Sequence, residues 1–251
     1  MNLFDSHCHL DAAEFDADRA QVLASARAAG VAAQLIPAVD RASWPAIATL
    51  VAREPGLYAA YGLHPMFLDR HTDADLAALP AFIAAHPTVA VGECGLDFFL
   101  PDADRDRQRA ILRPQLELAR ERDLPVILHG RRALDALLAE VRSVGGLRGI
   151  VHSFSGSQEQ ARQWCQAGFL LGFGGPVSYP RASRLRAVVA DLPLAHLALE
   201  TDAPDQPLFG HQGQRNTPAH LPQVLAVIAE LRQQDPATIA TATTHNLRQL
   251  L

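Results

Sequence analysis

The feature that most constrains the fold is an alternation of short apolar runs with longer helix-like segments, repeated eight times along the chain. Each run is almost continuously apolar, which is typical of strands that are buried on both faces of a parallel sheet. The runs are Leu3–Ser6, Ala33–Val39, Tyr58–Gly62, Val89–Gly92, Val126–Leu128, Ile150–Val151, Leu170–Phe173 and Leu197–Leu199.

The segments between the runs have the spacing of amphipathic helices. Within Arg105–Arg122, for example, apolar residues fall near one stripe and arginines lie elsewhere. The other predicted helices are Arg19–Ala29, Trp44–Arg53, Ala74–Ala85, Ala133–Val141, Gln158–Ala167, Leu185–Ala190, Leu221–Leu231 and Ala237–Leu250. This order predicts an α/β fold, a single (β/α)8 TIM barrel that spans residues 1–251. A doubly wound sheet is the alternative, but the Gly-x-Gly-x-x-Gly fingerprint that often accompanies it is absent.

Composition excludes several classes of function. The net charge of −5 argues against broad nonspecific binding to nucleic acid, which usually needs a basic face, although a local basic groove is compatible with it. The chain has no lysine, which excludes a Schiff-base lysine, a P-loop lysine and a carbamylated lysine between two metals. Its three cysteines are too few and too scattered for a disulfide framework.

The expected location is the cytoplasm. No apolar stretch approaches the roughly 20 residues that a membrane helix needs. The first residues, Met1–Asp5, lack the basic start and the apolar core of a signal peptide. Neither a membrane nor an obligate protein partner is indicated by the sequence.

Metal-binding residue types follow most of the apolar runs. In α/β barrels the carboxyl ends of the strands meet at one mouth, so side chains far apart in the sequence can converge there. The candidates at these ends are His7, His9, His64, Glu93, His129, His152, Glu200 and Asp202. We therefore predict a metal site at the carboxyl ends of the strands.

Local spacing supports some of these candidates. His7 and His9 are two residues apart, so on a strand both imidazoles point to the same side and can reach one cation; two histidines on a polar strand end are the alternative. Glu93 follows an apolar run, where a buried carboxylate needs a partner. A cation, which the carboxylate can share with a second one, is our preferred partner for Glu93, and a core salt bridge to an arginine is the alternative.

The later strand ends suggest a second metal position. His129 and His152, taken singly, are typical of hydrogen-bonded core histidines, but their matching places favour ligands. Asp202 and Glu200 share a side of the last strand. We choose Asp202 as ligand and proton acceptor because it lies further out, and assign Glu200 a supporting role.

Other residues have open interpretations. Arg131 is a candidate clamp for an anionic substrate, and Arg215 with Asn216 can face either substrate or solvent. Cys8 and Cys94 flank ligands, but they are expected to pack as small apolar groups. Surface or structural roles are expected for the remaining histidines, and the glycine turn after the seventh run is either a phosphate cradle or a simple turn. These histidines are His71, His86, His196, His211, His220 and His245.

Six segments together resemble the TatD family of metal-dependent deoxyribonucleases, within the amidohydrolase superfamily. They occur in the right order over nearly the whole chain. The segments are Asp5–Asp11 (DSHCHLD), Tyr61–Pro65 (YGLHP), Gly92–Asp97 (GECGLD), Pro125–Arg131 (PVILHGR), His152–Gly156 (HSFSG) and Glu200–Pro204 (ETDAP).

The resemblance implies a TIM barrel that hydrolyses phosphodiester bonds, commonly from a 3′ end. It implies one metal among His7, His9, Glu93 and Asp202. It implies a second metal among Glu93, His129 and His152, with Glu93 shared. His64 would lie beside the metals and contact substrate. With a metal-activated water as nucleophile, Asp202, Glu93 and His64 are the predicted catalytic residues, and His64, Arg131 and Arg215 the predicted substrate contacts.

Two departures from the family pattern bear on substrate. Asp205 stands where the family often has an aromatic residue, which removes a stacking platform and adds negative charge. Phe98 stands where tyrosine is frequent and lacks the hydroxyl. The expected substrate is DNA or a small anionic molecule. Hydrolysis of an amide, lactone or aminoacyl ester by the same metals is the alternative, and a barrel that binds metal without catalysis is a third hypothesis.

One or two divalent cations are expected. Four imidazoles suit zinc or manganese better than magnesium, whereas the family nucleases often work with magnesium. Zinc or manganese is therefore favoured and magnesium remains possible.

Overall fold

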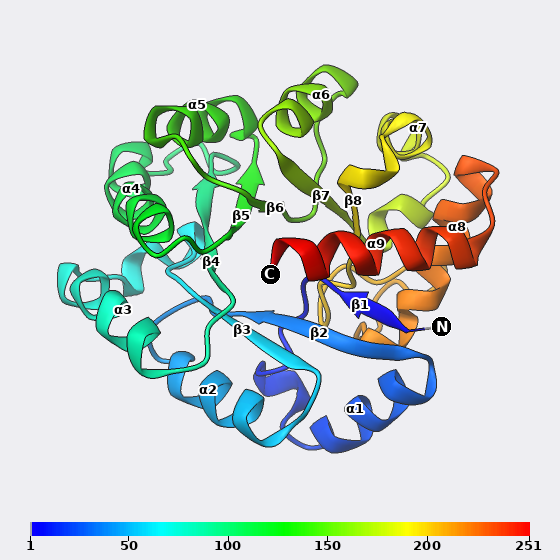
Figure 1. The fold of residues 1–251 in the computed structure, drawn as a ribbon, viewed down its shortest axis with the longest axis horizontal. Helices are drawn as coiled ribbons and strands as arrows, with labels where there is room; N and C mark the ends of the chain where they lie inside the picture. The colour runs from blue at the N-terminus through cyan, green and yellow to red at the C-terminus, as the bar shows by residue number, and fades with distance from the viewer. Residues whose placement is uncertain (1) are drawn as a thin grey trace.

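Eight parallel strands pair in the order in which they occur in the sequence, and helices surround them (Figure 1). The structure is a computed structural model that describes residues 2–251. The strands are β1 (Leu3–Asp5), β2 (Val31–Pro37), β3 (Leu57–Tyr61), β4 (Ala90–Asp97), β5 (Val126–Arg131), β6 (Gly149–Val151), β7 (Phe169–Phe173) and β8 (Leu197–Leu199). All eight predicted strands are present, and the predicted (β/α)8 barrel is confirmed.

Nine α-helices occur among the described residues, and the first seven each follow the strand of the same number. They are α1 (Arg19–Ala28), α2 (Trp44–Arg53), α3 (Asp73–Ala85), α4 (Arg105–Glu121), α5 (Leu134–Val144), α6 (Gln158–Gln166), α7 (Ser183–Asp191), α8 (Leu221–Arg232) and α9 (Pro236–Leu250). Within residues 2–251 no helix has both the length and the apolar character that crossing a membrane requires.

Backbone hydrogen bonds link the first and last strands of the sheet, β1 and β8, near their ends. The amide of Ser6 donates to the carbonyl of Leu199 over 2.9 Å, and the amide of Asp202 donates to the carbonyl of His7 over the same distance. The buried carboxylate of Asp5 adds a side-chain link, because it accepts hydrogen bonds from the backbone and the hydroxyl of Thr201. The segments that follow β1 and β8 are thereby held side by side.

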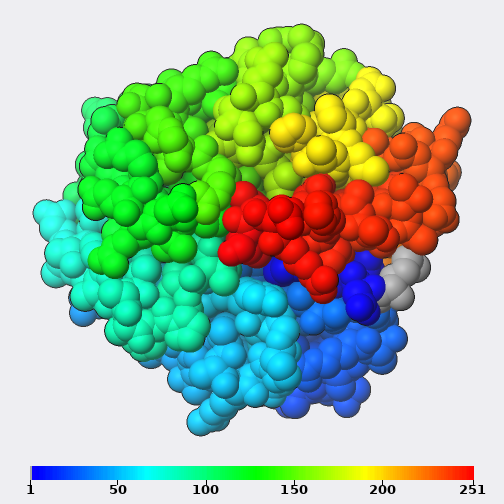
Figure 2. Space-filling view, viewed as in Figure 1, coloured from blue at the N-terminus to red at the C-terminus, as the bar shows by residue number. Residues whose placement is uncertain are grey.

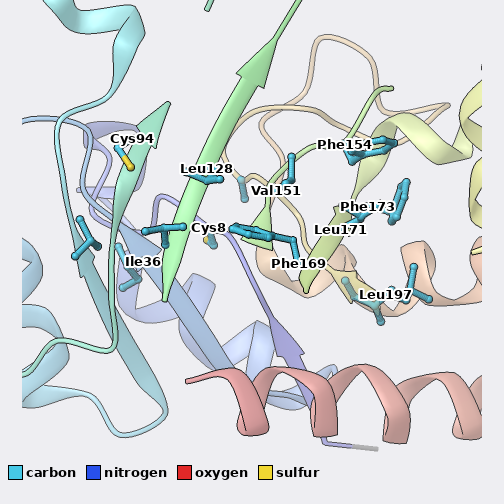
Figure 3. Packing of buried hydrophobic residues seen from close by; sticks show 14 of the residues in the cluster. Cys8, Ile36, Cys94, Leu128, Val151, Phe154, Phe169, Leu171, Phe173 and Leu197 are labelled. Atoms are coloured by element: carbon cyan, nitrogen blue, oxygen red, sulfur yellow. The ribbon is translucent and has the colours of Figure 1, made fainter. Parts of the chain in front are cut away.

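The apolar core has two layers, because successive side chains of a strand point to opposite faces. The outer layer lies between the sheet and the helices; Figure 3 shows part of it, including Leu128, Val151 and Leu171. The inner layer contains smaller residues such as Ala90 and Ala198, together with Leu247 and Leu250 of α9.

Helix α9 covers the end of the barrel at which the strands begin. It crosses the middle of the view in Figure 1, and in Figure 2 its atoms fill the centre of that face. Its Leu247 side chain is fully buried against the inner layer, and Thr244 donates a hydrogen bond to the carbonyl of Asn2. This end of the barrel is therefore sealed by apolar packing.

Polar side chains lie at the other end of the barrel, where the strands end, because the inward-facing positions of the strands carry them there. Ile127 and Ile150 belong to the inner layer, and His129 and His152 follow two positions later on the same side of their strands. Strands β4 and β5 also continue further than predicted, pairing as far as Asp97 with Arg131. The ladder therefore includes His129, which pairs with Gly95, while Glu93 lies at an irregularity of β4 between Val91 and Cys94.

Candidate metal centre

The carboxylate of Glu93 lies at the centre of the polar end. Its side chain is 1% exposed, and its two oxygens face different groups of histidines. Oε2 lies 3.1 Å from Nε2 of His7, and Oε1 lies 3.2 Å from Nδ1 of His129. A single carboxylate can therefore serve two cation positions.

The first group contains His7, His9 and Asp202, and the structure brings their ligand atoms together. Nε2 of His7 is 3.2 Å from Nε2 of His9, and each lies 3.6 Å from Oδ1 of Asp202. The geometry arises differently from the prediction, since β1 ends at Asp5 and both histidines lie beyond it. They converge because the segment after β1 is bonded to the segment after β8.

The second group contains His129 and His152, which face Glu93 from β5 and from the end of β6. Nε2 of His152 lies 3.9 Å from Oε1 of Glu93 and 3.7 Å from Oδ2 of Asp202. Its other ring nitrogen, Nδ1, lies 3.1 Å from Oε1 of Glu200. Glu200 also accepts a hydrogen bond from the amide of Ser153, which fits the supporting role expected for it.

His64 also reaches Glu93, with Nε2 3.0 Å from Oε1. Its Nδ1 accepts a hydrogen bond from the amide of Met66 at the start of the short 3-10 helix Pro65–Arg70. A neutral imidazole has one protonated and one bare nitrogen, so Nε2 carries the proton and donates to Glu93. His64 is therefore a donor in this arrangement, although its distances resemble those of a metal ligand.

Burial keeps three of these imidazoles neutral. Desolvation lowers the pKa of His9 to about 4, lowers that of His64, and places that of His7 well below its usual value. A neutral imidazole has the free electron pair that a metal requires. His152 differs: burial also disfavours its charge, but Glu200, Asp202 and Glu93 outweigh that effect and raise its pKa to about 10, so a metal that binds His152 must displace a proton from the ring.

The carboxylates respond to the same surroundings in opposite directions. Burial by itself would raise the pKa of Glu93, but the adjacent imidazoles of His64, His7 and His152 hold it well below the usual value. Burial raises the pKa of Asp202 to about 7, with His152 opposing that effect and Glu93 adding to it. Glu93 is therefore the permanent anion, whereas Asp202 can exchange a proton near neutral pH.

The loop after β8 presents Asp202 in an uncommon conformation. Asp202 has a φ of 55°, and two residues around it, Ser153 and Gln206, also have positive φ values of 47° and 50°. Non-glycine residues adopt this region at a cost and are frequent at functional sites. Gln206 donates a hydrogen bond to Oδ2 of Asp202 and contacts the Ser153 hydroxyl, which ties the three together.

These side chains line a pocket of about 950 Å³. Arg70, Arg131, Met66 and Phe67 contribute to one part of its wall. Another part, formed by segments after β1 and β8, contains the carboxylates of Asp11, Glu14 and Asp205. The mouth therefore combines cationic and acidic parts, and both are relevant to which substrate can enter.

The two arginines expected to contact substrate have different surroundings. Arg131 lines the pocket, and its guanidinium lies 3.5 Å from the centre of the Phe99 ring. Arg215 instead donates two hydrogen bonds to the carboxylate of Asp18 and lies over the ring of Phe15. The pocket lining does not include Arg215, so the structure does not bring this residue to the site.

Several residues with open interpretations have structural places. Asn216 is buried and donates hydrogen bonds to the carbonyls of Thr201 and Asp205, which fixes the loop after β8. Cys8 and Cys94 are fully buried in the outer core layer, as expected. Phe98 lies against Arg105 and is not part of the pocket lining.

The remaining histidines mostly make hydrogen bonds within the structure. His71 bonds to the carbonyl of His64, His86 to that of Phe82, and His196 to that of Phe169. Gly172, which was expected in the turn after the seventh run, lies within β7, and its lack of a side chain has a structural reason. A Cβ at this position would lie 2.1 Å from Oε2 of Glu200, so the glycine leaves the space that Glu200 occupies.

The residues present fit a divalent cation. Oε2 of Glu93 is a buried atom without a hydrogen-bond partner among residues 2–251. A carboxylate and several imidazoles on neighbouring strand ends are ligands that zinc and manganese accept. Three sets of ligand atoms lie close enough to hold a metal, namely His7 with Glu93 and His152, His7 with His9 and Asp202, and His64 with Glu93 and His129.

The chain is similar in sequence and in structure to known proteins. Residues 4–251 match the family described as TatD related DNase. The chain is 45% identical over 245 residues to YjjV of Escherichia coli (strain K12), named only as a metal-dependent hydrolase, covering 96% of this chain and 95% of that one. A crystal structure of YjjV has a TM-score of 0.96 to this chain at 43% identity, covering 99% and 97% of the two chains.

A second relative has a more specific name. The chain is 34% identical over 255 residues to the 3′-5′ ssDNA/RNA exonuclease TatD of Cronobacter sakazakii, covering 99% of this chain and 97% of that one. The matches extend over nearly the full length of both relatives. The chain belongs to the TatD family and is a metal-dependent hydrolase built on a TIM barrel.

Proposed function

We propose that this hydrolase cleaves phosphodiester bonds of DNA from a 3′ end. The observation that carries the proposal is the division of the Glu93 carboxylate between two groups of ligand atoms. Two adjacent cations in such a site stabilise both the attacking and the leaving oxygen of an in-line displacement, and lower the pKa of a bound water. The name of the exonuclease relative supports the choice of a nucleic acid.

The metal ligands in this proposal are His7, His9, Glu93 and Asp202 on one side of Glu93, and Glu93, His129 and His152 on the other. Asp202 also serves as the proton acceptor. Its Oδ1 and Oδ2 face different ligand groups, so one oxygen can bind a cation while the other accepts a proton.

Two further groups act on the substrate. His64 carries its one proton on Nε2, where it donates to Glu93, and it lines the pocket, so it can shift this hydrogen bond from Glu93 to the leaving oxygen. Arg131 supplies a positive charge at the rim, where it can pair with a phosphate. We expect zinc or manganese to be the bound metal, because the site contains four imidazoles, with magnesium able to support activity.

Hydrolysis of labelled DNA tests the proposal. Metal-stripped protein reloaded with Zn²⁺, Mn²⁺ or Mg²⁺ is incubated with a single-stranded oligonucleotide labelled at its 5′ end and with circular single-stranded DNA. We expect stepwise shortening of the linear strand, no cleavage of the circle, and no activity before reloading. Failure to cleave any phosphodiester after reloading would rule the proposal out.

A second function is favoured by the acidic part of the wall. Asp205 lines the pocket together with Asp11 and Glu14. This arrangement opposes a polyanion and suits a neutral or cationic substrate, such as an amide, a lactone or an aminoacyl ester. Turnover of these substrates by a protein that leaves DNA intact would establish this second function.

A further inference from the structure

A carboxylate outside both ligand groups touches one of the proposed ligands. Oδ2 of Asp97, at the end of β4, lies 2.8 Å from Nε2 of His129, while Nδ1 of the same ring faces Glu93. His129 pairs across the ladder with Gly95, midway between Glu93 and Asp97. A Cβ on Gly95 would lie 2.0 Å from the carbonyl oxygen of His129, so only glycine permits this close approach. The imidazole therefore spans the gap between the two carboxylates.

We propose that Asp97 is a positioning residue, which takes the Nε2 proton of His129 in a hydrogen bond and thereby leaves Nδ1 as the nitrogen that binds metal. An ionised carboxylate can only accept hydrogen bonds, so it selects the ring form with the proton on Nε2. Ligating histidines usually donate their other N–H to such a group, which also fixes the ring orientation. The inference rests on the proposed metal site but not on the choice of substrate.

The backbone of Asp97 is held by a helix on the outside of the barrel. Gln108 of α4 is buried; its Oε1 accepts from the amide of Asp97 over 2.7 Å, and its Nε2 donates to the carbonyl over 2.8 Å. Gln115, two turns later on α4, bonds in the same way to the amide and carbonyl of Leu63, the neighbour of His64. Helix α4 thus fixes the strand ends that present both His64 and Asp97.

Comparison with His64 shows that the hydrogen-bond partner of a histidine decides which ring nitrogen carries the proton. It lies as close to Oε1 of Glu93 as His129 does, at 3.0 Å against 3.2 Å. The amide of Met66 donates to Nδ1 of His64, whereas the carboxylate of Asp97 accepts from Nε2 of His129. The first partner leaves a donor facing Glu93, and the second leaves a bare nitrogen. Two rings at similar distances from Oε1 of Glu93 therefore differ in role: one presents a hydrogen-bond donor and the other a nitrogen that can bind metal.

The test is Asp97→Asn, which separates positioning from a purely structural role. Oδ1 of Asp97 also accepts from the amide of Phe99, and an asparagine oxygen can keep that bond. The asparagine NH2 group would then face Nε2 of His129 and favour the ring form with the proton on Nδ1, where the metal needs the electron pair. The matched control is Asp104→Asn, because Asp104 caps α4 and does not touch His129.

Zinc affinity of the metal-stripped proteins is measured by competition with a chromogenic chelator, with thermal unfolding as a check on folding. We expect zinc to bind Asp97→Asn about 10- to 100-fold more weakly at one site, with Asp104→Asn unchanged. 15N NMR spectra of the zinc-loaded wild-type protein should show that His129 is protonated at Nε2. Unchanged affinity in a folded Asp97→Asn protein overturns the role of Asp97 alone, whereas a wild type that binds no divalent metal overturns the proposed function as well.

Discussion

The two ends of the barrel use the same strands for different purposes. Where the strands begin, small apolar residues and the leucines of α9 exclude water and close the barrel. Where the strands end, the same inward-facing positions carry His129, His152 and Glu200, and the pocket opens. The difference teaches that the sealed end contributes packing and the open end contributes chemistry, so substitutions at the sealed end should leave metal binding intact.

The largest effect is expected from Glu93→Gln at the open end. The amide keeps the size but removes the charge that faces both ligand groups, so metal should be lost and turnover should fall by at least about 1,000-fold, or about 4 kcal/mol. Metal content and kcat are the measurements. Glu117→Gln, on the exposed surface of α4, is the control. An active Glu93→Gln protein would show that the open end does not work through this carboxylate.

At the sealed end, Leu247→Ala should act on stability instead. Leu247 is fully buried against the inner layer, and its truncation leaves a cavity worth about 2–5 kcal/mol of unfolding free energy. Chemical denaturation measures the loss, with the exposed Arg248→Ala as control. Metal content at 25 °C should stay that of the wild type. If metal were lost while the protein remained folded, the two ends would not be independent.

Gly172→Ala tests the open end by crowding. The added Cβ would lie 2.1 Å from Oε2 of Glu200, so Glu200 must move away from His152. We expect a loss of about 1–3 kcal/mol in unfolding free energy from overpacking. Zinc affinity should weaken together with stability. Gly168→Ala is not a suitable control because of its positive φ, so Ala167→Gly, at the end of α6, serves instead.

Arg131→Ala should change substrate binding without changing metal content. Removing one cation at the rim should raise KM for a DNA oligonucleotide about tenfold and reduce the salt dependence of binding by about one charge. Steady-state kinetics at several salt concentrations measure both. An unchanged KM would mean that the nucleic acid, if it binds, avoids this part of the rim.

Arg215→Ala is expected to have the smallest effect, and it has a defined pH dependence. The hydrogen bond from Arg215 lowers the pKa of Asp18, so the unfolded chain takes up a proton there at higher pH than the folded protein does. The pair therefore stabilises the fold above the unfolded pKa of Asp18 and ceases to do so as pH falls through the folded pKa. Unfolding free energies of Arg215→Ala and wild type should differ slightly at pH 7 and converge in acid, with KM unchanged.

The barrel could be predicted from the sequence because each of its strands and helices is recognisable from neighbouring residues alone. Each buried strand is a short apolar run, and each helix has its own periodicity. The ends of β6 and β8 already place His152 and Glu200, since positions two residues apart share a side. His7 and His9 were predicted to converge because both would point to one side of a strand. They do converge, but both lie past the end of β1, so strand alternation is not the cause.

Contacts between distant segments could not be predicted in this way. Arg215 pairs with Asp18, 197 residues earlier, and nothing near either residue indicates that pairing. Asp97 was not among the predicted site residues either. It lies four residues after Glu93, and on an extended strand this spacing places both side chains on the same side. The left-handed conformation of Asp202 depends on the loop that Asn216 and Gln206 hold, which is a property of the folded chain.

Anomalous diffraction from crystals of the zinc- or manganese-loaded protein tests most directly whether the strand ends hold metal. We predict density beside Oε2 of Glu93 among His7, His9 and Asp202, and a second peak beside Oε1 near His129 and His152. Metal bound only elsewhere on the molecule, with these side chains left as they stand, would contradict the assignment of this end of the barrel.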